Sequence, residues 1–213
     1  MKKTIIGLCG YAGAGKDTAA DAMLLVANRF ANAEAARFAF ADPMRDMLRA
    51  LGVPLALMSD RILKERPIPG LGRSYRQLAQ TLGTEWGRVC HGEDFWVKAL
   101  AKRVDESSAR IILISDVRFP NEAEWIKSTG GCLARVNRPG VIDVTPHVSE
   151  AHVDGFKPDY ELNNLGSLLT LQWNSAQLLC RIMSEHSPVF VRAAIALREE
   201  PKLLPGIVSP VTQ

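Results

Sequence analysis

The sequence predicts an α/β fold, with a parallel sheet of about five strands between layers of helices on both faces. Short apolar runs alternate with segments of helical periodicity, which is typical of strand–helix–strand units. The runs expected to form strands are residues 4–9, 37–40, 111–116, 132–136 and 160–162. A glycine-rich loop joins the first run to the first helix. Such sheets hold ligands beyond the carboxyl ends of their strands, so we expect the site there.

Helices are predicted between these strands. Their expected ranges are residues 17–31, 44–51, 75–90, 94–105, 120–128, 166–186 and 189–198. Residues 54–74 are rich in Pro, Gly and Arg and are predicted to form a mobile basic insertion. We therefore expect one domain over residues 1–200, with a core of 1–53 and 108–186, a helical insertion over about 54–107, and a tail over 201–213.

Composition narrows the class of protein. An apolar content of 47% and a charged content of 23% are ordinary for a globular protein. The net charge of +3 is too small to predict nucleic-acid binding but fits small polyanions in a local basic cleft. The cysteines are scattered without metal-ligand spacing, and no apolar run approaches a membrane span. We expect a cytoplasmic protein with reduced cysteines and no membrane or nucleic-acid partner.

Residues 10–18, Gly-Tyr-Ala-Gly-Ala-Gly-Lys-Asp-Thr, carry the most specific signal. A buried strand, a glycine loop ending in Gly-Lys and a helix are the context of a phosphate-binding P-loop. Glycines let backbone N–H groups turn toward phosphate oxygens, and the helix N-terminus adds its positive end. Lys16 is then expected to reach the outer phosphates.

Asp17 stands where P-loops usually have Ser or Thr. Its carboxylate can contact magnesium or the waters of the metal, because hard cations prefer oxygen ligands. Alternatively, it is only a negative charge favoured in the first turn of a helix. Thr18 would then offer its hydroxyl to an inner phosphate.

Asp116 ends the apolar strand 111–115, the position of a Walker B acid that orients magnesium directly or through water. The alternative is a helix cap. Arg118 lies two residues on and can clamp a phosphate. Glu122 falls in the first turn of the next helix, where a ligand role and a helix-dipole role are equally open.

The segment 73–88 offers a second polar set. Arg73 and Arg76 bracket a helix start, where guanidinium and N–H groups can hold a phosphate. Gln80 and Thr84 lie on the same helical face as Arg76 and can pair with a nucleobase edge, with Trp96 as a flat wall. Periodicity alone favours an amphipathic helix with solvated polar residues and core tryptophans. Elsewhere, Arg138 can lie over nucleotide phosphates or base, and His147 and His152 fit a surface role better than zinc binding.

The segment 15–21 is similar to the P-loop of phage-type deoxynucleoside monophosphate kinases, which share the aspartate after the lysine. Segments 40–43, 76–87, 93–97 and 116–122 resemble the same family, so the resemblance covers roughly residues 3–170. It implies an adenylate-kinase-like P-loop kinase fold. It also implies magnesium-assisted transfer of the ATP γ-phosphoryl group to a deoxynucleoside monophosphate, in the host cytoplasm if the chain is phage-encoded.

The resemblance places Gly13, Gly15, Lys16, Asp17 and Thr18 in the ATP site and Arg76, Gln80, Gly83, Thr84 and Trp96 in the acceptor site. We add Ala14 and Arg138 to the first set and Arg73 and Glu122 to the second. Gln77 stands where the family can carry a basic residue, so Arg73 is expected to share phosphate binding. The expected catalytic residues are Lys16, Asp17, Arg76, Asp116 and Arg118. Asp17 and Asp116 are expected to bind the metal directly or through water.

Two other functions fit the sequence. One is a P-loop kinase for another phosphorylated acceptor, such as a phosphomevalonate- or dephospho-coenzyme-A-type substrate. The other is a nucleotide-binding packaging or regulatory module without acceptor-dependent turnover, which would not require the arginines at 73 and 76. A homodimer is also left open.

Overall fold

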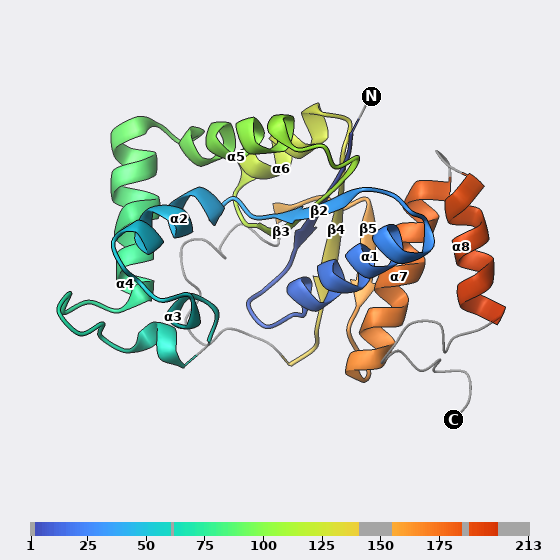
Figure 1. Cartoon of the computed structure of the whole chain (residues 1–213), viewed down its shortest axis with the longest axis horizontal. Helices are drawn as coiled ribbons and strands as arrows, with labels where there is room; N and C mark the ends of the chain where they lie inside the picture. The colour runs from blue at the N-terminus through green and yellow to red at the C-terminus, as the bar shows by residue number, and fades with distance from the viewer. Residues whose placement is uncertain (1–2, 61, 141–154, 185–187, 200–213) are drawn as a thin grey trace. The chain divides into compact units, whose positions relative to one another are not determined.

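The computed structural model describes residues 3–60, 62–140, 155–184 and 188–199. The chain forms two compact units, one of Met1–Phe38 with Ser107–Gln213 and the other of Ala39–Glu106. The first contains the sheet and the second is helical (Figure 1). The inserted unit therefore begins earlier in the chain than the predicted residue 54.

The sheet of the larger unit has five parallel strands within the described residues, in the order β2-β3-β1-β4-β5. They are β1 (Thr4–Cys9), β2 (Ala35–Phe38), β3 (Ile111–Val117), β4 (Cys132–Asn137) and β5 (Tyr160–Asn163). The central strands are buried on both faces, which explains their nearly continuous apolar runs. The predicted α/β fold with a five-stranded parallel sheet is confirmed.

The second strand lies earlier in the chain than predicted. The prediction was residues 37–40, but β2 is Ala35–Phe38, because this is the stretch in register with Ile111–Ile114 of β3. Ala39 and Phe40, which extended the apolar run, are buried in the other unit.

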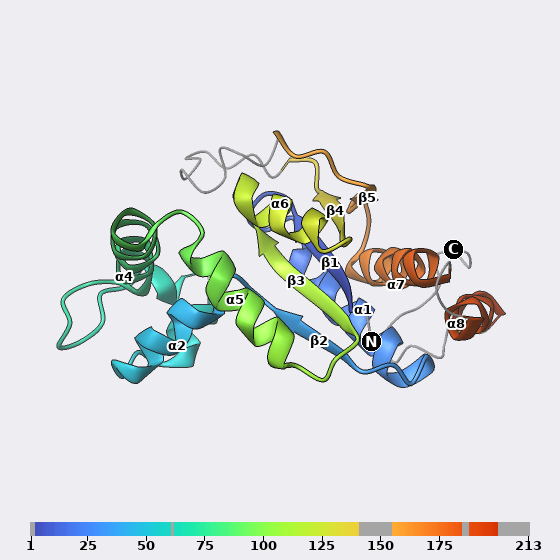
Figure 2. The same ribbon diagram turned by 90° about the horizontal axis from the view of Figure 1, so that it is seen from above.

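Helices cover both faces of the sheet (Figure 2). Helix α1 (Lys16–Phe30) packs on α7 (Leu168–Ser184), and α8 (Pro188–Glu199) packs on α7. The core between α1, α7 and the sheet includes Ile6, Leu8 and Met23. Helix α6 (Pro120–Ser128) contacts β1 and β4 on the opposite face. Gly7 faces α6 so closely that an added Cβ would lie 2.6 Å from Ile126 Cδ1.

The smaller unit is a set of short helices. They are α2 (Asp42–Ala50), α3 (Leu55–Ser59), the 3₁₀ turn η1 (Leu63–Glu65), α4 (Tyr75–Gln80), the π-helix η2 (Thr81–Cys90) and α5 (Phe95–Glu106). Its core contains Leu48, Val53, Met58, Ile68 and Tyr75. The stretch predicted as a mobile insertion thus contains α3 and η1, and its mobility stays a prediction.

None of the described helices combines the length and the apolar character needed to cross a membrane.

Candidate active site

The loop between β1 and α1 is shaped by glycines. Gly10, Gly13 and Gly15 have φ values of 139°, 77° and 106°, which side chains other than glycine rarely allow. A Cβ at Gly10 would lie 2.5 Å from the carbonyl oxygen of Val136, and one at Gly15 would lie 2.6 Å from Leu171 Cδ2. The loop is therefore pressed against β4 and α7, at the carboxyl edge of the sheet.

The N-terminus of α1 faces this loop. Gly15 is the N-cap residue and supplies no side-chain cap to the first N–H groups of the helix. Lys16, the first helical residue, is 9% exposed, and its Nζ donates to the carbonyl oxygens of Gly10 at 2.7 Å and Tyr11 at 2.9 Å. The ammonium group is thus held over the loop, where it can exchange carbonyl oxygens for phosphate oxygens.

Asp17 and Thr18 lie in the first turn of α1. The Asp17 side chain is 79% exposed, with Oδ1 3.8 Å from Nη1 of Arg37, which also donates to Asp21 at 2.8 Å. Thr18 is half-buried. An exposed carboxylate here suits either a metal ligand or a helix-dipole charge, so both interpretations stay open.

Asp116 lies at the same edge of the sheet as the loop. The next residue, Val117, is opposite Cys9 in the β1–β3 pairing, and Cys9 directly precedes the loop. Strand-end reasoning predicted this arrangement.

Glu122 shapes the turn after β3. It is 2% exposed, and its Oε2 accepts the backbone N–H groups of Arg118 at 2.8 Å and Phe119 at 3.1 Å. This carboxylate therefore faces the backbone at the start of α6. Its assignment to the acceptor site, like that of Arg118 to a phosphate, stays a prediction.

Two side chains distant in sequence hold carbonyl groups of the loop. Nη1 of Arg138 donates to the oxygen of Gly13 at 3.2 Å, so this predicted ATP-site residue does lie beside the loop. Nδ2 of Asn164 donates to the oxygen of Ala14 at 2.9 Å. Sequence reasoning missed Asn164, because the bond joins residues 150 positions apart.

Arg135 adds another cation at this edge. It lies opposite Cys9 in the β1–β4 pairing, and its Nη2 donates to the carbonyl oxygen of Phe156 at 2.7 Å. Burial raises the pKa of the Cys9 thiol, while the charges of Arg135 and Lys16 act against that shift. With Lys16 and Arg138, Arg135 makes the loop's surroundings electropositive, as an anion site requires.

The carboxylates of Asp17 and Asp116 suit a magnesium ion that is bound partly by the phosphates of a nucleotide. Among the described residues, no three of His, Cys, Asp or Glu gather closely enough to hold a metal ion. Magnesium is usually bound by one or two carboxylates together with substrate phosphates and water, and Asp17 and Asp116 offer such oxygens. His147 and His152 lie outside the described residues.

The predicted acceptor residues, apart from Glu122, lie in the smaller unit. Arg73 and Arg76 flank Ser74, which caps α4 by accepting the Gln77 N–H at 3.2 Å. Arg76 is 44% exposed and forms an ion pair with Glu65 of η1. Gln80 and Thr84 follow along the same helical stretch and are exposed.

Trp96 and Gly83 contact each other. The indole N–H of Trp96 donates to the oxygen of Gly83 at 2.8 Å, and an added Cβ at Gly87 would lie 2.4 Å from that nitrogen. Trp96 is only 4% exposed and packs against Phe95 and Trp86. Its ring is engaged in the unit's packing, and its role as a wall for a base stays a prediction.

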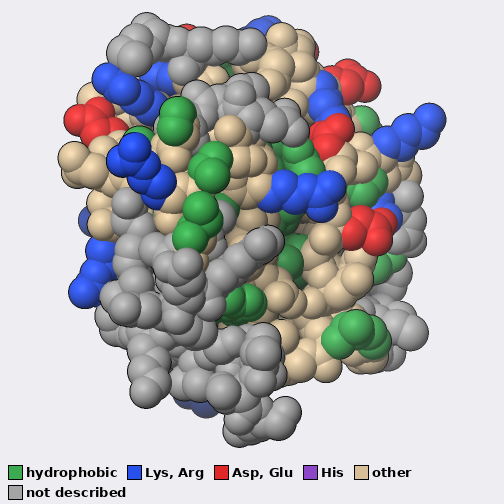
Figure 3. Space-filling view, turned by 90° about the vertical axis from the view of Figure 1, so that its right-hand side faces the viewer, with side chains coloured by type: hydrophobic (Ala, Val, Ile, Leu, Met, Phe, Trp, Pro, Cys, Tyr) green, Lys and Arg blue, Asp and Glu red, His purple; other side chains and the backbone are tan. Residues whose placement is uncertain are grey.

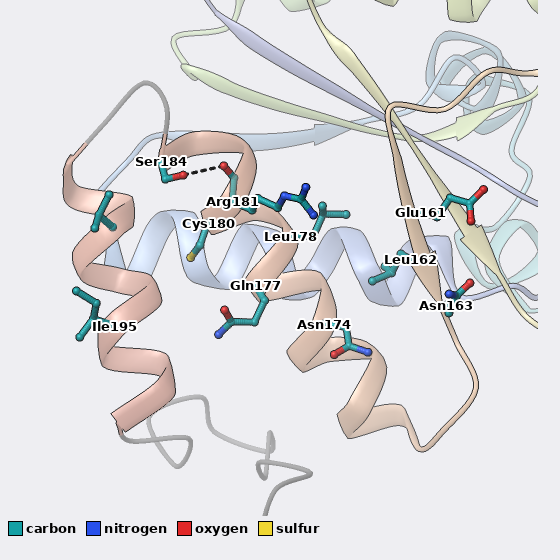
Figure 4. A pocket seen from close by; sticks show the side chains of 11 residues that line it. Glu161, Leu162, Asn163, Asn174, Gln177, Leu178, Cys180, Arg181, Ser184 and Ile195 are labelled. Carbon is teal, nitrogen blue, oxygen red and sulfur yellow. Dashed lines mark hydrogen bonds between the residues drawn. The ribbon is translucent and has the colours of Figure 1, made fainter.

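A pocket of about 650 Å³ lies apart from the loop, between β5, α7 and α8 (Figure 4). Its polar lining includes Glu161, Asn163, Asn174, Gln177 and Arg181. The face that carries α8 also exposes Val189, Val191 and Ile195, and hydrophobic side chains there are interspersed with Lys and Arg (Figure 3). No sequence motif pointed to this region.

Comparison with known proteins identifies the family of the chain. A family model described as deoxynucleotide monophosphate kinase matches residues 72–174. A protein of Acanthamoeba polyphaga mimivirus named as a deoxynucleotide monophosphate kinase is 30% identical over 174 residues, 72% of this chain and 83% of the viral protein. The deoxynucleoside-5'-monophosphate kinase of Escherichia phage T5 is 36% identical over 76 residues, which cover 36% of this chain and 30% of the phage protein.

A gluconokinase from Sinorhizobium meliloti superposes with a TM-score of 0.40 and 9% identity, over 87% of this chain and 98% of the gluconokinase. That similarity is too low to bear on function. The mimivirus match spans most of both chains, and the family model covers the segments around Arg76 and Asp116. With the glycine loop and Lys16 in place at the sheet edge, the chain belongs to the deoxynucleotide monophosphate kinase family.

Proposed function

We propose that this chain transfers the γ-phosphoryl group of ATP to a deoxynucleoside monophosphate, giving ADP and the deoxynucleoside diphosphate. The observation that supports this most directly is the loop itself. Its glycine conformations, the N-terminus of α1 and the ammonium group of Lys16 converge at the carboxyl edge of the sheet. Membership of the kinase family then indicates what the bound triphosphate is used for.

The residues of the larger unit would bind and orient the donor. Backbone N–H groups of the loop and Lys16 would hold the phosphates, and Arg138 and Arg135 would add positive potential. Asp17 and Asp116 would hold magnesium, which when bound neutralises charge on the transferring phosphoryl group. The rest of catalysis is positioning, because phosphoryl transfer in line needs no covalent intermediate.

The residues of the smaller unit would bind the acceptor. Arg76 and Arg73 would hold its phosphate, and Gln80 and Thr84 would form hydrogen bonds with its base. Arg76 is paired with Glu65 through half-exposed side chains, and such a pair contributes little stability. A phosphate dianion can therefore replace the carboxylate of Glu65 as the partner of Arg76.

An acceptor panel tests the proposal. ADP release would be measured with ATP and magnesium against dGMP, dTMP, dCMP and dAMP, the matching ribonucleotides, dephospho-coenzyme A, phosphomevalonate and no acceptor. We expect turnover that depends on at least one deoxynucleoside monophosphate. Turnover only with a non-nucleotide acceptor, or ATP binding without acceptor-dependent turnover, would overturn the proposal.

Lys16→Ala tests the loop within the same assay. We expect a loss of about 100-fold or more in kcat, because a charge on the transferring group is left uncompensated. Lys102→Ala is the matched control, since Lys102 is 79% exposed on α5 and pairs only loosely with Glu106 at 3.9 Å. Near-normal turnover of a folded Lys16→Ala protein would refute the assigned role.

A further inference from the structure

We infer that Asn164 is a positioning residue for the phosphate-binding loop, fixing the orientation of the peptide between Ala14 and Gly15. Its Nδ2 donates to the carbonyl oxygen of Ala14 at 2.9 Å. This inference rests on the proposed function, since it concerns how the loop receives a triphosphate.

The sheet fixes the position of Asn164. It directly follows β5, and its backbone N–H donates to the oxygen of Asn137 at 2.7 Å, which extends the β4–β5 pairing by one bond. Side chains alternate along a strand, and Leu162 is buried in the core shared with α1 and α7. Asn164 therefore lies on the same face as Leu162, toward α1, in agreement with its bond to Ala14, whereas the Asn163 side chain is exposed.

Gly15 provides the space for this amide group. A Cβ built on Gly15 would lie 3.0 Å from Nδ2 of Asn164 and 2.6 Å from Leu171 Cδ2. Because glycine has no side chain, however, the peptide preceding it can rotate between conformations at little steric cost. The loop therefore needs a contact from outside to select one of them.

The hydrogen bond from Asn164 makes that selection. The carbonyl of Ala14 and the N–H of Gly15 belong to one planar trans peptide, so they point in opposite directions. Because the Ala14 oxygen is bonded to the side chain of Asn164, the N–H of Gly15 points to the side away from β5. In the rotated peptide a carbonyl oxygen would face that side instead, and it would repel a phosphate where an N–H would bind one.

Three variants separate positioning from plain stability. Asn164→Asp keeps the shape of the side chain, loses the donor and adds a negative charge. Asn164→Ala removes the group. Asn163→Ala is the matched control, because Asn163 is exposed and its Oδ1 accepts a long bond of 3.3 Å from Nδ2 of Asn137, away from the loop.

The dissociation constant of magnesium–ATP would be measured by calorimetry, beside KM for ATP, KM for the acceptor and the melting temperature. We expect Asn164→Ala to weaken ATP binding and raise KM for ATP roughly tenfold, with the acceptor KM within about threefold at saturating ATP. Asn164→Asp should bind ATP more weakly still, and Asn163→Ala should stay within about twofold of the wild type.

A folded Asn164→Ala or Asn164→Asp protein that binds ATP within twofold of the wild type would overturn the inference. A purely structural role would lower the melting temperature and leave the dissociation constant of the folded protein unchanged. Should Asn164→Ala fail to fold, the shape-conserving Asn164→Asp variant decides. Wild-type protein that binds ATP without acceptor-dependent turnover would refute the proposed function alone, and wild-type protein that binds no ATP would overturn both.

Discussion

Replacing Glu122 by alanine should destabilise the turn that carries Arg118 away from β3. The Glu122 side chain is almost fully buried, and one of its oxygens accepts the N–H groups of Arg118 and Phe119. Alanine would leave two partly buried backbone donors without this acceptor.

The size of the effect follows from these two bonds. A fully buried donor that loses its acceptor costs about 1–3 kcal/mol, so two partly buried donors cost at most roughly 2–6 kcal/mol. Water entering the vacated space would recover part of this, and we expect a loss of about 3 kcal/mol in the free energy of unfolding. Glu122→Gln retains an oxygen that can accept both bonds, and in these two bonds it loses the charge assistance, about 1 kcal/mol.

Urea unfolding followed by circular dichroism would measure both variants, with Glu124→Ala as control. Glu124 is exposed on the same helix, and its replacement should change stability by no more than about 0.5 kcal/mol. The reasoning fails if Glu122→Ala costs less than about 1 kcal/mol at an unchanged m-value. It also fails if the glutamine variant is as unstable as the alanine variant, because the charge rather than the acceptor geometry would then be decisive.

Two further predictions concern thiols and acid stability. Cys90 is exposed, whereas Cys9 is fully buried and burial raises the thiol pKa of Cys132 and Cys180 to about 11. A thiol-reactive disulfide reagent at pH 8 should therefore modify Cys90 first, and a fast-reacting thiol that persists in Cys90→Ser would contradict this. Burial acts to raise the pKa of Asp159, but hydrogen bonds from Lys127 and the Leu133 N–H hold it below its usual value. The stability advantage of the wild type over Asp159→Asn should thus persist above about pH 4 and shrink as the pH falls through the lowered pKa, and an advantage that grew in acid would refute it.

The sheet and the loop could be predicted from sequence because their signals are local. The run Thr4–Cys9 and the glycines after it predicted the strand, the loop and a helix start at residue 17, and α1 begins at Lys16. Strand-end reasoning also placed Asp116 at the loop's edge of the sheet, where the structure has it. The error at β2 has a non-local cause, since its limits depend on register with β3 rather than on its own apolar run.

The periodicity of apolar residues after Tyr75 predicted a helix but not its type. A continuous helix over 75–90 was predicted, and the structure has α4 followed by the π-helix η2. Gly83 and Gly87 lie four residues apart on this stretch, and the indole of Trp96 contacts the backbone at both. Two glycines at helical spacing are a sequence signal for close approach of another side chain, but they do not reveal which one.

The phosphate-binding loop shows why a motif predicts a site more securely than it predicts the residues that complete it. Its glycines permit conformations that other residues cannot adopt, but the same freedom leaves the loop underdetermined. The contacts that fix it come from β4 and its following turn, through Val136 and Arg138, and from the residue after β5, Asn164. The affinity of the loop for a triphosphate should therefore depend on the placement of Val136, Arg138 and Asn164, so substitutions that displace these residues can alter ATP binding without changing the motif.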